Sequence, residues 1–119
     1  SPGYLDLKIG SGRMHLRQGK LAQAKRDADD VLAVAPDNVD ALLLGGIVQR
    51  SAGNYAEAKR LLERGVARSP GYADFYVVLG GIAEAEGRVA DALRYYDKAL
   101  ELRPESHDVA ARRARLARS

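Results

Sequence analysis

The sequence has no cysteine and no tryptophan, and its 119 residues include only four prolines, two histidines, one phenylalanine and one methionine. Without cysteine, the chain cannot form a disulfide scaffold or a thiolate zinc site. The two histidines, His15 and His107, are far apart in the sequence. We therefore predict no metal site and no cofactor. A hydrophobic content of 46% also argues against a disordered segment.

Long apolar runs and a strong net charge are also lacking. The longest apolar stretches, residues 41–48 and 75–83, fall well short of the roughly 18 residues that span a bilayer. We predict no membrane insertion by this segment. No signal peptide is predicted, because no basic stretch followed by an apolar one begins the sequence. A net charge of +3 is too small to indicate a nucleic-acid partner.

Internal repetition is the strongest signal in the sequence. The only prolines are evenly spaced, at Pro2, Pro36, Pro70 and Pro104, and we call their common spacing the repeat step. Three further columns keep this step: Gly12, Gly46 and Gly80; Gly19, Gly53 and Gly87; and Ala24, Ala58 and Ala92. Such agreement over three periods indicates a repeat architecture.

Each period is predicted to contain two helices, because its apolar residues follow a helical step. In the second period the two predicted helices cover residues 39–52 and 55–68. Gly53 lies between them and suits a left-handed helix end, whereas Pro70 stops the second helix. Small residues such as Gly46 and Ala58 allow the paired helices to approach closely. One pair cannot bury its apolar residues alone, so we expect neighbouring pairs to stack.

The repeat step divides the chain into residues 5–38, 39–72 and 73–106, within a single array covering 1–119. Residues 1–4 read Ser-Pro-Gly-Tyr, which is identical to residues 69–72. We interpret them as the end of a preceding repeat, so the chain is expected to be a segment of a longer array. Residues 107–119 are predicted to form a capping helix or the first helix of a next repeat, with Ser106 as a candidate N-cap.

The third period carries a family resemblance. Its pattern, Tyr76-x2-Leu79-Gly80-x2-Ala83, then Ala92-x3-Tyr96-x2-Ala99, then Pro104, resembles the tetratricopeptide repeat. This resemblance implies an all-α, right-handed α–α superhelix of three repeats plus one helix, working as a protein-interaction scaffold. The first period departs from the pattern. It has Lys8, Ser11 and His15 at positions where the pattern has bulky packing residues. Its first helix also contains Gly10, Ser11 and Gly12, which are weak helix formers.

No catalytic constellation emerges from the remaining residues. The Gly19-Lys20 pair lacks the other residues of a phosphate-binding loop, and we expect His15 to fill the core or the groove. Asp27, Asp29 and Asp30 form the densest acidic cluster, which we interpret as a solvated helix face. Glu84 and Glu86 point different ways on a helix, which disfavours a paired-carboxylate site. The segment is predicted not to be an enzyme.

The resemblance implies that the first helix of each pair lines a concave groove that binds partners. The candidate groove residues are Asp6, Ile9, Arg13, Leu16, Arg17, Asp40, Leu43, Ile47, Arg50, Ser51, Asp74, Val77, Gly81, Glu84 and Ala85. Family members that grip a chaperone's terminal carboxylate use Lys and Asn at positions that here carry Ile9, Arg13, Leu44, Asp74 and Val78. That clamp is missing, although Arg13, Arg17 and Arg50 suit some other acidic group.

A narrower resemblance concerns residues 37–45 and 55–58. Their sequence is similar to that of periplasmic arrays in bacterial exopolysaccharide exporters, including those for Pel, cellulose and poly-N-acetylglucosamine. Of these, the Pel exporter is the preferred match. It implies a periplasmic scaffold that recruits polysaccharide-modifying enzymes, contacts polymer and guides it to an outer-membrane porin. Two alternatives stay open: a cytoplasmic adaptor or assembly factor that binds peptides, and a substrate-selecting array attached to a glycosyltransferase.

Overall fold

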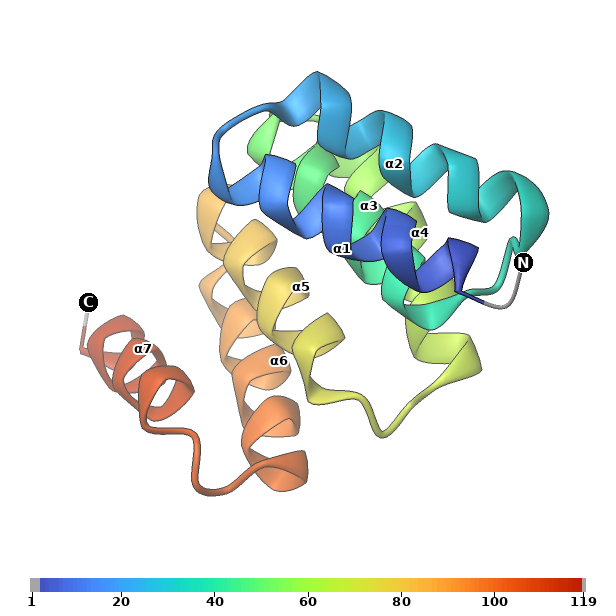
Figure 1. Cartoon of the computed structure of the whole chain (residues 1–119). Coiled ribbons are helices and arrows are strands. Elements are labelled where there is room, and N and C mark those ends of the chain that lie inside the picture. Colours follow the sequence, from blue (N-terminus) through green and yellow to red (C-terminus); the bar gives the residue numbers. More distant parts are fainter. Residues whose placement is uncertain (1–2, 119) are drawn as a thin grey trace. The chain divides into compact units, whose positions relative to one another are not determined.

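The computed structural model describes residues 3–118 and contains seven helices and no strand within them. The helices are α1 (Tyr4–Arg17), α2 (Leu21–Val34), α3 (Val39–Ser51), α4 (Tyr55–Arg68), α5 (Ala73–Ala85), α6 (Val89–Leu102) and α7 (His107–Ala117) (Figure 1). The all-α class is confirmed, as is the arrangement of three helix pairs followed by one helix. Even α1, with its two internal glycines, forms over 14 residues.

The chain divides into two compact units. The first unit ends at Arg68 and holds α1 to α4, whereas the second begins at Ser69 and holds α5 to α7. In the first unit, α1 packs on α2, and α3 packs on α2, α4 and α1. In the second unit, α6 packs on both α5 and α7. First and second helices therefore pack as pairs within each unit, as the repeat step predicts.

The turn inside each pair depends on a glycine with a left-handed backbone. Gly19, Gly53 and Gly87 have φ values of 75°, 82° and 75°, and no other described residue has a positive φ. At the middle turn, the Gly53 N–H donates to the carbonyl of Arg50 at 3.0 Å and the Asn54 N–H donates to Gln49 at 2.8 Å. These bonds satisfy carbonyls that the end of α3 leaves open. The predicted role of this glycine column is confirmed.

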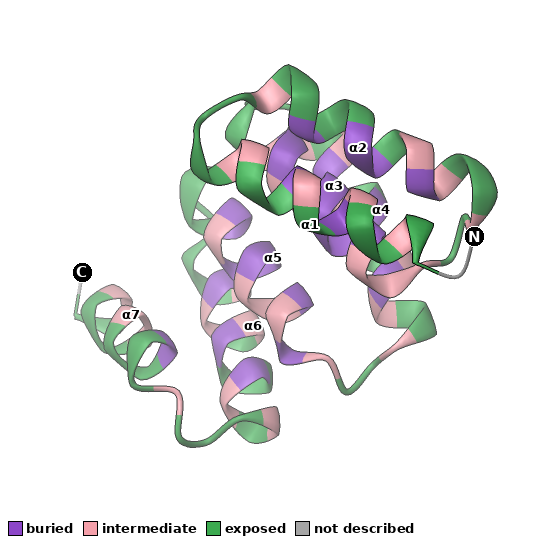
Figure 2. Ribbon diagram, in the orientation of Figure 1, coloured by how far each residue is buried: buried purple, intermediate pink, exposed green. Residues whose placement is uncertain are grey.

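A second glycine column sets the spacing between the helices of a pair. A Cβ built on Gly46 of α3 would lie 2.5 Å from Cδ2 of Leu62 on α4. Leu62 and Ala58 are both fully buried, so the absence of a side chain at Gly46 lets the two backbones come together. Figure 2 shows buried residues concentrated along α3, between its neighbours α2 and α4.

Apolar clusters join successive helices within each unit. In the first unit, Ala24 and Ala28 of α2 cluster with Leu44 and Val48 of α3. In the second unit, the cluster consists of Ala83, Ala92, Tyr96, Ala99 and Val109, so α5, α6 and α7 share one core. The burial of these side chains contributes to the stability of each unit.

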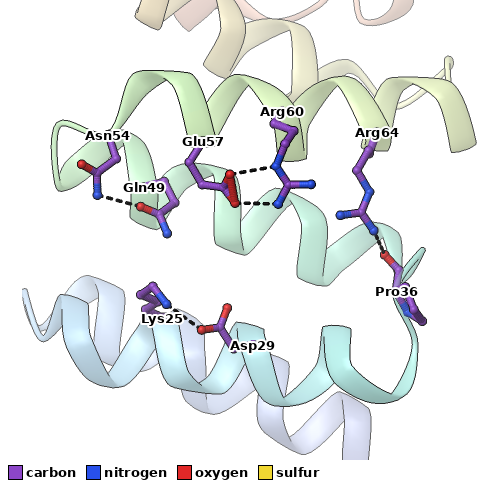
Figure 3. Close-up of polar contacts among 8 residues, drawn as sticks. All are labelled: Lys25, Asp29, Pro36, Gln49, Asn54, Glu57, Arg60 and Arg64. Atoms are coloured by element: carbon purple, nitrogen blue, oxygen red, sulfur yellow. Dashed lines mark hydrogen bonds and ion pairs between the residues drawn. The ribbon is translucent and has the colours of Figure 1, made fainter.

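Polar contacts reinforce the loops of the first unit (Figure 3). The Arg64 side chain donates to the Pro36 carbonyl at 2.6 Å, and Asn54 Nδ2 donates to Gln49 Oε1 at 2.9 Å. Asn38 caps α3 by accepting from the Ala41 N–H at 3.0 Å. Ser106, the candidate cap of α7, occupies the N-cap position without a capping side-chain bond.

Candidate functional site

The first helices of the first unit, α1 and α3, bring two predicted groove residues together. Arg13 Nη2 lies 3.6 Å from Asp40 Oδ1, and both side chains are about half exposed, at 51% and 48%. An exposed ion pair of this kind contributes about 0–1 kcal/mol to stability. Its main effect is therefore on the charge pattern, because Asp40 offsets the charge of Arg13.

The other two predicted cations are Arg17, the last residue of α1, and Arg50, near the end of α3. Arg17 is exposed and Arg50 is half-buried. Neither has an ion pair or a side-chain hydrogen bond within residues 3–118. Positive charge near a helix C-terminus is favourable in itself, but these guanidinium groups also keep all their donors open to a carboxylate or a phosphate.

The apolar candidates differ in accessibility. Ile9 is 3% exposed and Leu43 is 7% exposed, so both side chains contribute to packing. Ile9 clusters with Val31 and Ala41. Ile47 is half-buried, whereas Asp6 and Ser51 are exposed. The exposed candidates on α1 and α3 are therefore polar, whereas Leu16 and Ile47 are accessible only in part.

The second unit contains a pocket between α5 and α7. Its volume is about 140 Å³, and it is lined by Ala73, Asp74, Val77, Ala99, Arg103, Ser106, Asp108 and Val109. Pockets for drug-sized ligands hold about 300–1,000 Å³, so this one has room for a single side chain. Asp74 and Val77 are predicted groove residues, and the structure places both in its wall.

The lining of the pocket combines apolar and charged residues. Arg103 Nη1 donates to Asp74 Oδ1 at 3.4 Å. Asp108 also lines the pocket; its side chain is 78% exposed, and Arg112 Nε lies 3.7 Å from its Oδ2. A side chain entering the pocket would thus meet alanine and valine together with groups of both charge signs.

Sequence reasoning missed Asp108, although a signal for it exists. An aspartate recurs at every repeat step, at Asp6, Asp40, Asp74 and Asp108. Each one lies in the first turn of its helix, where a negative charge interacts favourably with the helix dipole. The stability of the helices explains why the aspartate recurs. Two of these aspartates, Asp74 and Asp108, also line the pocket.

Glu84, another candidate groove residue, has a structural partner. Tyr96, fully buried on α6, donates its hydroxyl to Glu84 Oε1 at 2.6 Å. Burial, followed by the hydrogen bond to Glu84 and its negative charge, raises the pKa of Tyr96 to about 12, although Arg112 acts in the opposite direction. Glu84 therefore links α5 to α6 through this hydrogen bond, although the residue as a whole is exposed.

The interpretation of Asp27 as part of a solvated face is wrong. Asp27 is 6% exposed, and its Oδ2 accepts hydrogen bonds from Ser11 Oγ at 2.9 Å and His15 Nδ1 at 2.8 Å. Lys8 lies 3.6 Å from its other oxygen and 2.9 Å from Asp30. Asp29 lies on an exposed face, where it accepts from Lys25 at 2.7 Å (Figure 3), and the Asp30 side chain is 40% exposed.

This polar cluster, formed by Lys8, Ser11, His15, Asp27 and Asp30, joins α1 to α2. Burial on its own would raise the pKa of Asp27, but the hydrogen bonds from His15 and Ser11, together with nearby Lys8, outweigh it and lower the pKa. The equivalent position in the second period carries Leu61, which is buried. The first pair is thus held by charged groups where the second uses a leucine.

No three histidine or acidic side chains within residues 3–118 lie close enough together to hold a metal ion. Of the helices described, none combines the length and the apolar composition needed to cross a bilayer.

Comparison with known proteins gives a family match. The family model described as "Tetratricopeptide repeat" matches residues 10–58 and 43–107. No curated protein matches the chain. No catalytic domain is identified in it.

Solved structures give matches along nearly the whole chain. An O-GlcNAc transferase of Thermobaculum terrenum is 32% identical, with a TM-score of 0.91 over 97% of this chain, which spans only 22% of the transferase. The first repeat domain of Spaghetti (RPAP3), bound to the HSP90 peptide SRMEEVD, is 18% identical, with a TM-score of 0.90 over 97% of this chain and 94% of that one. The first such domain of human RPAP3 is 19% identical, with a TM-score of 0.91 over 99% and 93%.

Proposed function

The chain belongs to the tetratricopeptide repeat family, and we propose that it binds an extended peptide of a protein partner on its first helices. It is a protein-interaction scaffold. In the proposed complex, Arg17 and Arg50 hold an acidic group of the peptide. The observation that carries this proposal is that both arginines lack a partner within residues 3–118, whereas Arg13 is paired with Asp40.

Peptide binding by a domain of the same fold supports the proposal, since the first RPAP3 domain holds the HSP90 peptide SRMEEVD. The chemistry of recognition is expected to differ here. Of the positions that correspond to a carboxylate clamp, Ile9, Leu44 and Val78 are buried, with 3%, 3% and 6% exposed. Their side chains are too enclosed to contact a ligand, so the acidic group is assigned to the arginines instead.

The α5–α7 pocket offers a separate contact point, on the second unit, for a side chain of a protein partner. Its size suits one side chain, and its alanine and valine wall suits the apolar part of that side chain. Such an anchor would contribute apolar burial within the second unit.

The test uses two short fluorescein-labelled peptides, one rich in Asp and Glu and the other with Asn and Gln in their place. Fluorescence anisotropy should show tighter binding of the acidic peptide, and its affinity should fall as salt is added. Changing Arg17→Glu together with Arg50→Glu should weaken binding by about tenfold or more.

The matched control reverses two exposed arginines on second helices, Arg26→Glu with Arg68→Glu, and so changes the net charge equally. It should retain most of the affinity. Equal losses of affinity in both double variants would mean that only the net charge of the chain, and not the position of the two arginines, affects binding. No preference for the acidic peptide would remove the proposed role of the two arginines.

A second candidate function is selection of protein substrates for an attached glycosyltransferase. It is favoured by the 32% identity with the O-GlcNAc transferase, of which the chain spans 22%. The complete reading frame tests it: a transferase domain in the same polypeptide would support it, and its absence would end it.

The exporter role, with its periplasmic location and contact with polymer, rests only on the sequence of residues 37–45 and 55–58. None of the similar proteins described above adds support. The same reading frame decides it, because an exporter requires an export signal and a porin domain. A cytoplasmic peptide-binding adaptor is the alternative if the frame carries neither these nor a transferase.

A further inference from the structure

The α5–α7 pocket lies where the second unit has smaller side chains than the first. In the first unit, Ile9 and Val31 are buried in one cluster, and Leu5 packs against it. Two repeat steps further along the chain, the residues equivalent to Leu5, Ile9 and Val31 are Ala73, Val77 and Ala99. All of these smaller residues line the pocket, together with Val109, which is larger than its equivalent Ala41. Volume that the first unit fills with its own side chains is thus left open in the second.

A positive charge is missing at the same place. In the first unit, Asp40 of α3 pairs with Arg13 of α1, whose Nη2 lies 3.6 Å from Oδ1 of the aspartate. In the second unit, Asp108 of α7 is equivalent to Asp40, but the residue equivalent to Arg13 is Gly81. Helix α5 contains no lysine or arginine. It therefore offers Asp108 no cation, and this side chain is 78% exposed.

The charges around the pocket leave room for one more cation. The partner of Asp108 within residues 3–118 is Arg112 on its own helix, with Nε 3.7 Å from Oδ2. Arg103 lies 3.4 Å from Asp74 and 3.9 Å from Glu105, so two carboxylates offset its charge. These separations exceed the roughly 2.7–2.9 Å of a well-formed charge-assisted hydrogen bond. A carboxylate accepts several such bonds, so Asp108 retains acceptor positions for an incoming ligand.

We propose that the α5–α7 pocket receives a lysine side chain of a protein partner. This inference rests on the proposed function, since it names the side chain that the partner places in the pocket. The ammonium group pairs with Asp108, as Arg13 pairs with Asp40 in the first unit. Lysine meets both requirements of the site, because its apolar stem carries a compact charge with three donors. The stem packs against the apolar part of the lining, which consists of Ala73, Val77, Ala99 and Val109.

The test titrates the full chain with short peptides and follows its amide signals by NMR, which measures weak binding and also locates it. The probes are capped glycine–serine peptides that carry one central lysine, norleucine or glutamate. Norleucine has the apolar stem of lysine without the ammonium group. The lysine peptide should shift the signals of pocket residues such as Val77 and Val109, and it should bind about fivefold or more tightly than the other two.

Two variants remove the proposed partner of the ammonium group in different ways. Asp108→Asn takes away the charge, and Gly81→Arg gives α5 the arginine that α1 carries at the equivalent position. Each should lower the affinity for the lysine peptide to that for the norleucine peptide. Asp6→Asn is the matched control, because Asp6 is an exposed first-turn aspartate of the same column in the first unit. It should leave binding of the lysine peptide unchanged.

Several results would overturn the inference. Equal affinities for the lysine and norleucine peptides would show that the charge is not recognised. Tighter binding of the glutamate peptide would make Arg103 the group that selects the ligand. Equal losses in Asp108→Asn and Asp6→Asn would mean that only the net charge of the chain matters.

The outcome can be separated from that of the proposed function. Arg17 and Arg50 lie in the first unit, whereas the pocket lies in the second, so Asp108→Asn should leave binding of the acidic peptide unchanged. Acidic-peptide binding without a preference for lysine in the pocket would remove this inference alone. A lysine preference without acidic-peptide binding would instead remove the proposed role of the two arginines.

Discussion

The ring of Tyr96 lies directly against Gly80: a Cβ built on the glycine would stand 2.5 Å from Cε1 and 2.8 Å from Cδ1 of the tyrosine. The tyrosine is fully buried and its hydroxyl is bound to Glu84. The ring therefore has little freedom to move aside. The distance between α5 and α6 depends on this pairing of the smallest residue with a large aromatic one.

Gly80→Ala should destabilise the second unit. The added methyl must displace a buried ring, which costs about 1–3 kcal/mol for an overpacked core, and the higher helix propensity of alanine offsets up to about 1 kcal/mol. Urea unfolding measures the net loss. Gly10→Ala is the control, since a Cβ there meets no atom within 4 Å; it should gain stability, and a loss equal to that of Gly80→Ala would refute the steric argument.

Gly53→Ala should cost about 1–2 kcal/mol for a different reason. Its φ of 82° lies in the left-handed region, where a side chain meets the following carbonyl. No atom would touch the new Cβ, so the cost comes from the backbone alone. Gly53→Asn should recover part of the loss, because asparagine tolerates this conformation better. Equal midpoints for the two variants would contradict this explanation.

The raised pKa of Tyr96, about 12, has a consequence at alkaline pH. In the unfolded chain a tyrosine ionises near pH 10, so its contribution to stability is complete below that pH and is lost as the pH rises towards about 12. Tyr96→Phe should lose about 1 kcal/mol at neutral pH through the missing hydrogen bond. Its unfolding free energy should also fall less steeply above about pH 10, and identical slopes would contradict the assignment.

The helix pairs and their turns could be predicted because the same physical requirement recurs in each period. A left-handed turn needs Gly19, Gly53 and Gly87, and close helix packing needs Gly46 and Gly80. The predicted second helix of the middle pair, residues 55–68, agrees with α4, and the predicted first helix extends one residue beyond α3.

The environment of Asp27 was missed because local composition was given more weight than register. The charged residues around it, Lys25, Arg26, Asp29 and Asp30, suggest a solvated face, yet the same column holds Leu61 and Tyr95 in the later periods. A buried position there is expected from the repeat. The partners of Asp27 follow as well, since Ser11 and His15 occupy core positions of the facing helix. The ligand of the first helices cannot be obtained in this way, because exposed side chains are not constrained by packing.

Asp27→Asn tests the polar cluster. The carboxylate accepts bonds from Ser11 and His15 and lies beside Lys8, so the amide should cost about 1–3 kcal/mol at neutral pH. Because folding lowers the pKa of Asp27, its contribution to stability is complete above the unfolded value of about 3.9 and is lost as the pH falls through the folded value. The difference between wild type and variant should therefore shrink in acid.

The matched control for that experiment is Asp29→Asn on the same helix. Asp29 is 56% exposed and pairs with Lys25 one helical turn earlier, an interaction that stabilises a helix by about 0.2–0.5 kcal/mol. Urea unfolding at neutral pH and near pH 3 should show a large, acid-sensitive cost for Asp27→Asn and a small one for Asp29→Asn. A cost for Asp27→Asn that stays the same at both pH values would mean that packing, and not its charge, holds α1 to α2.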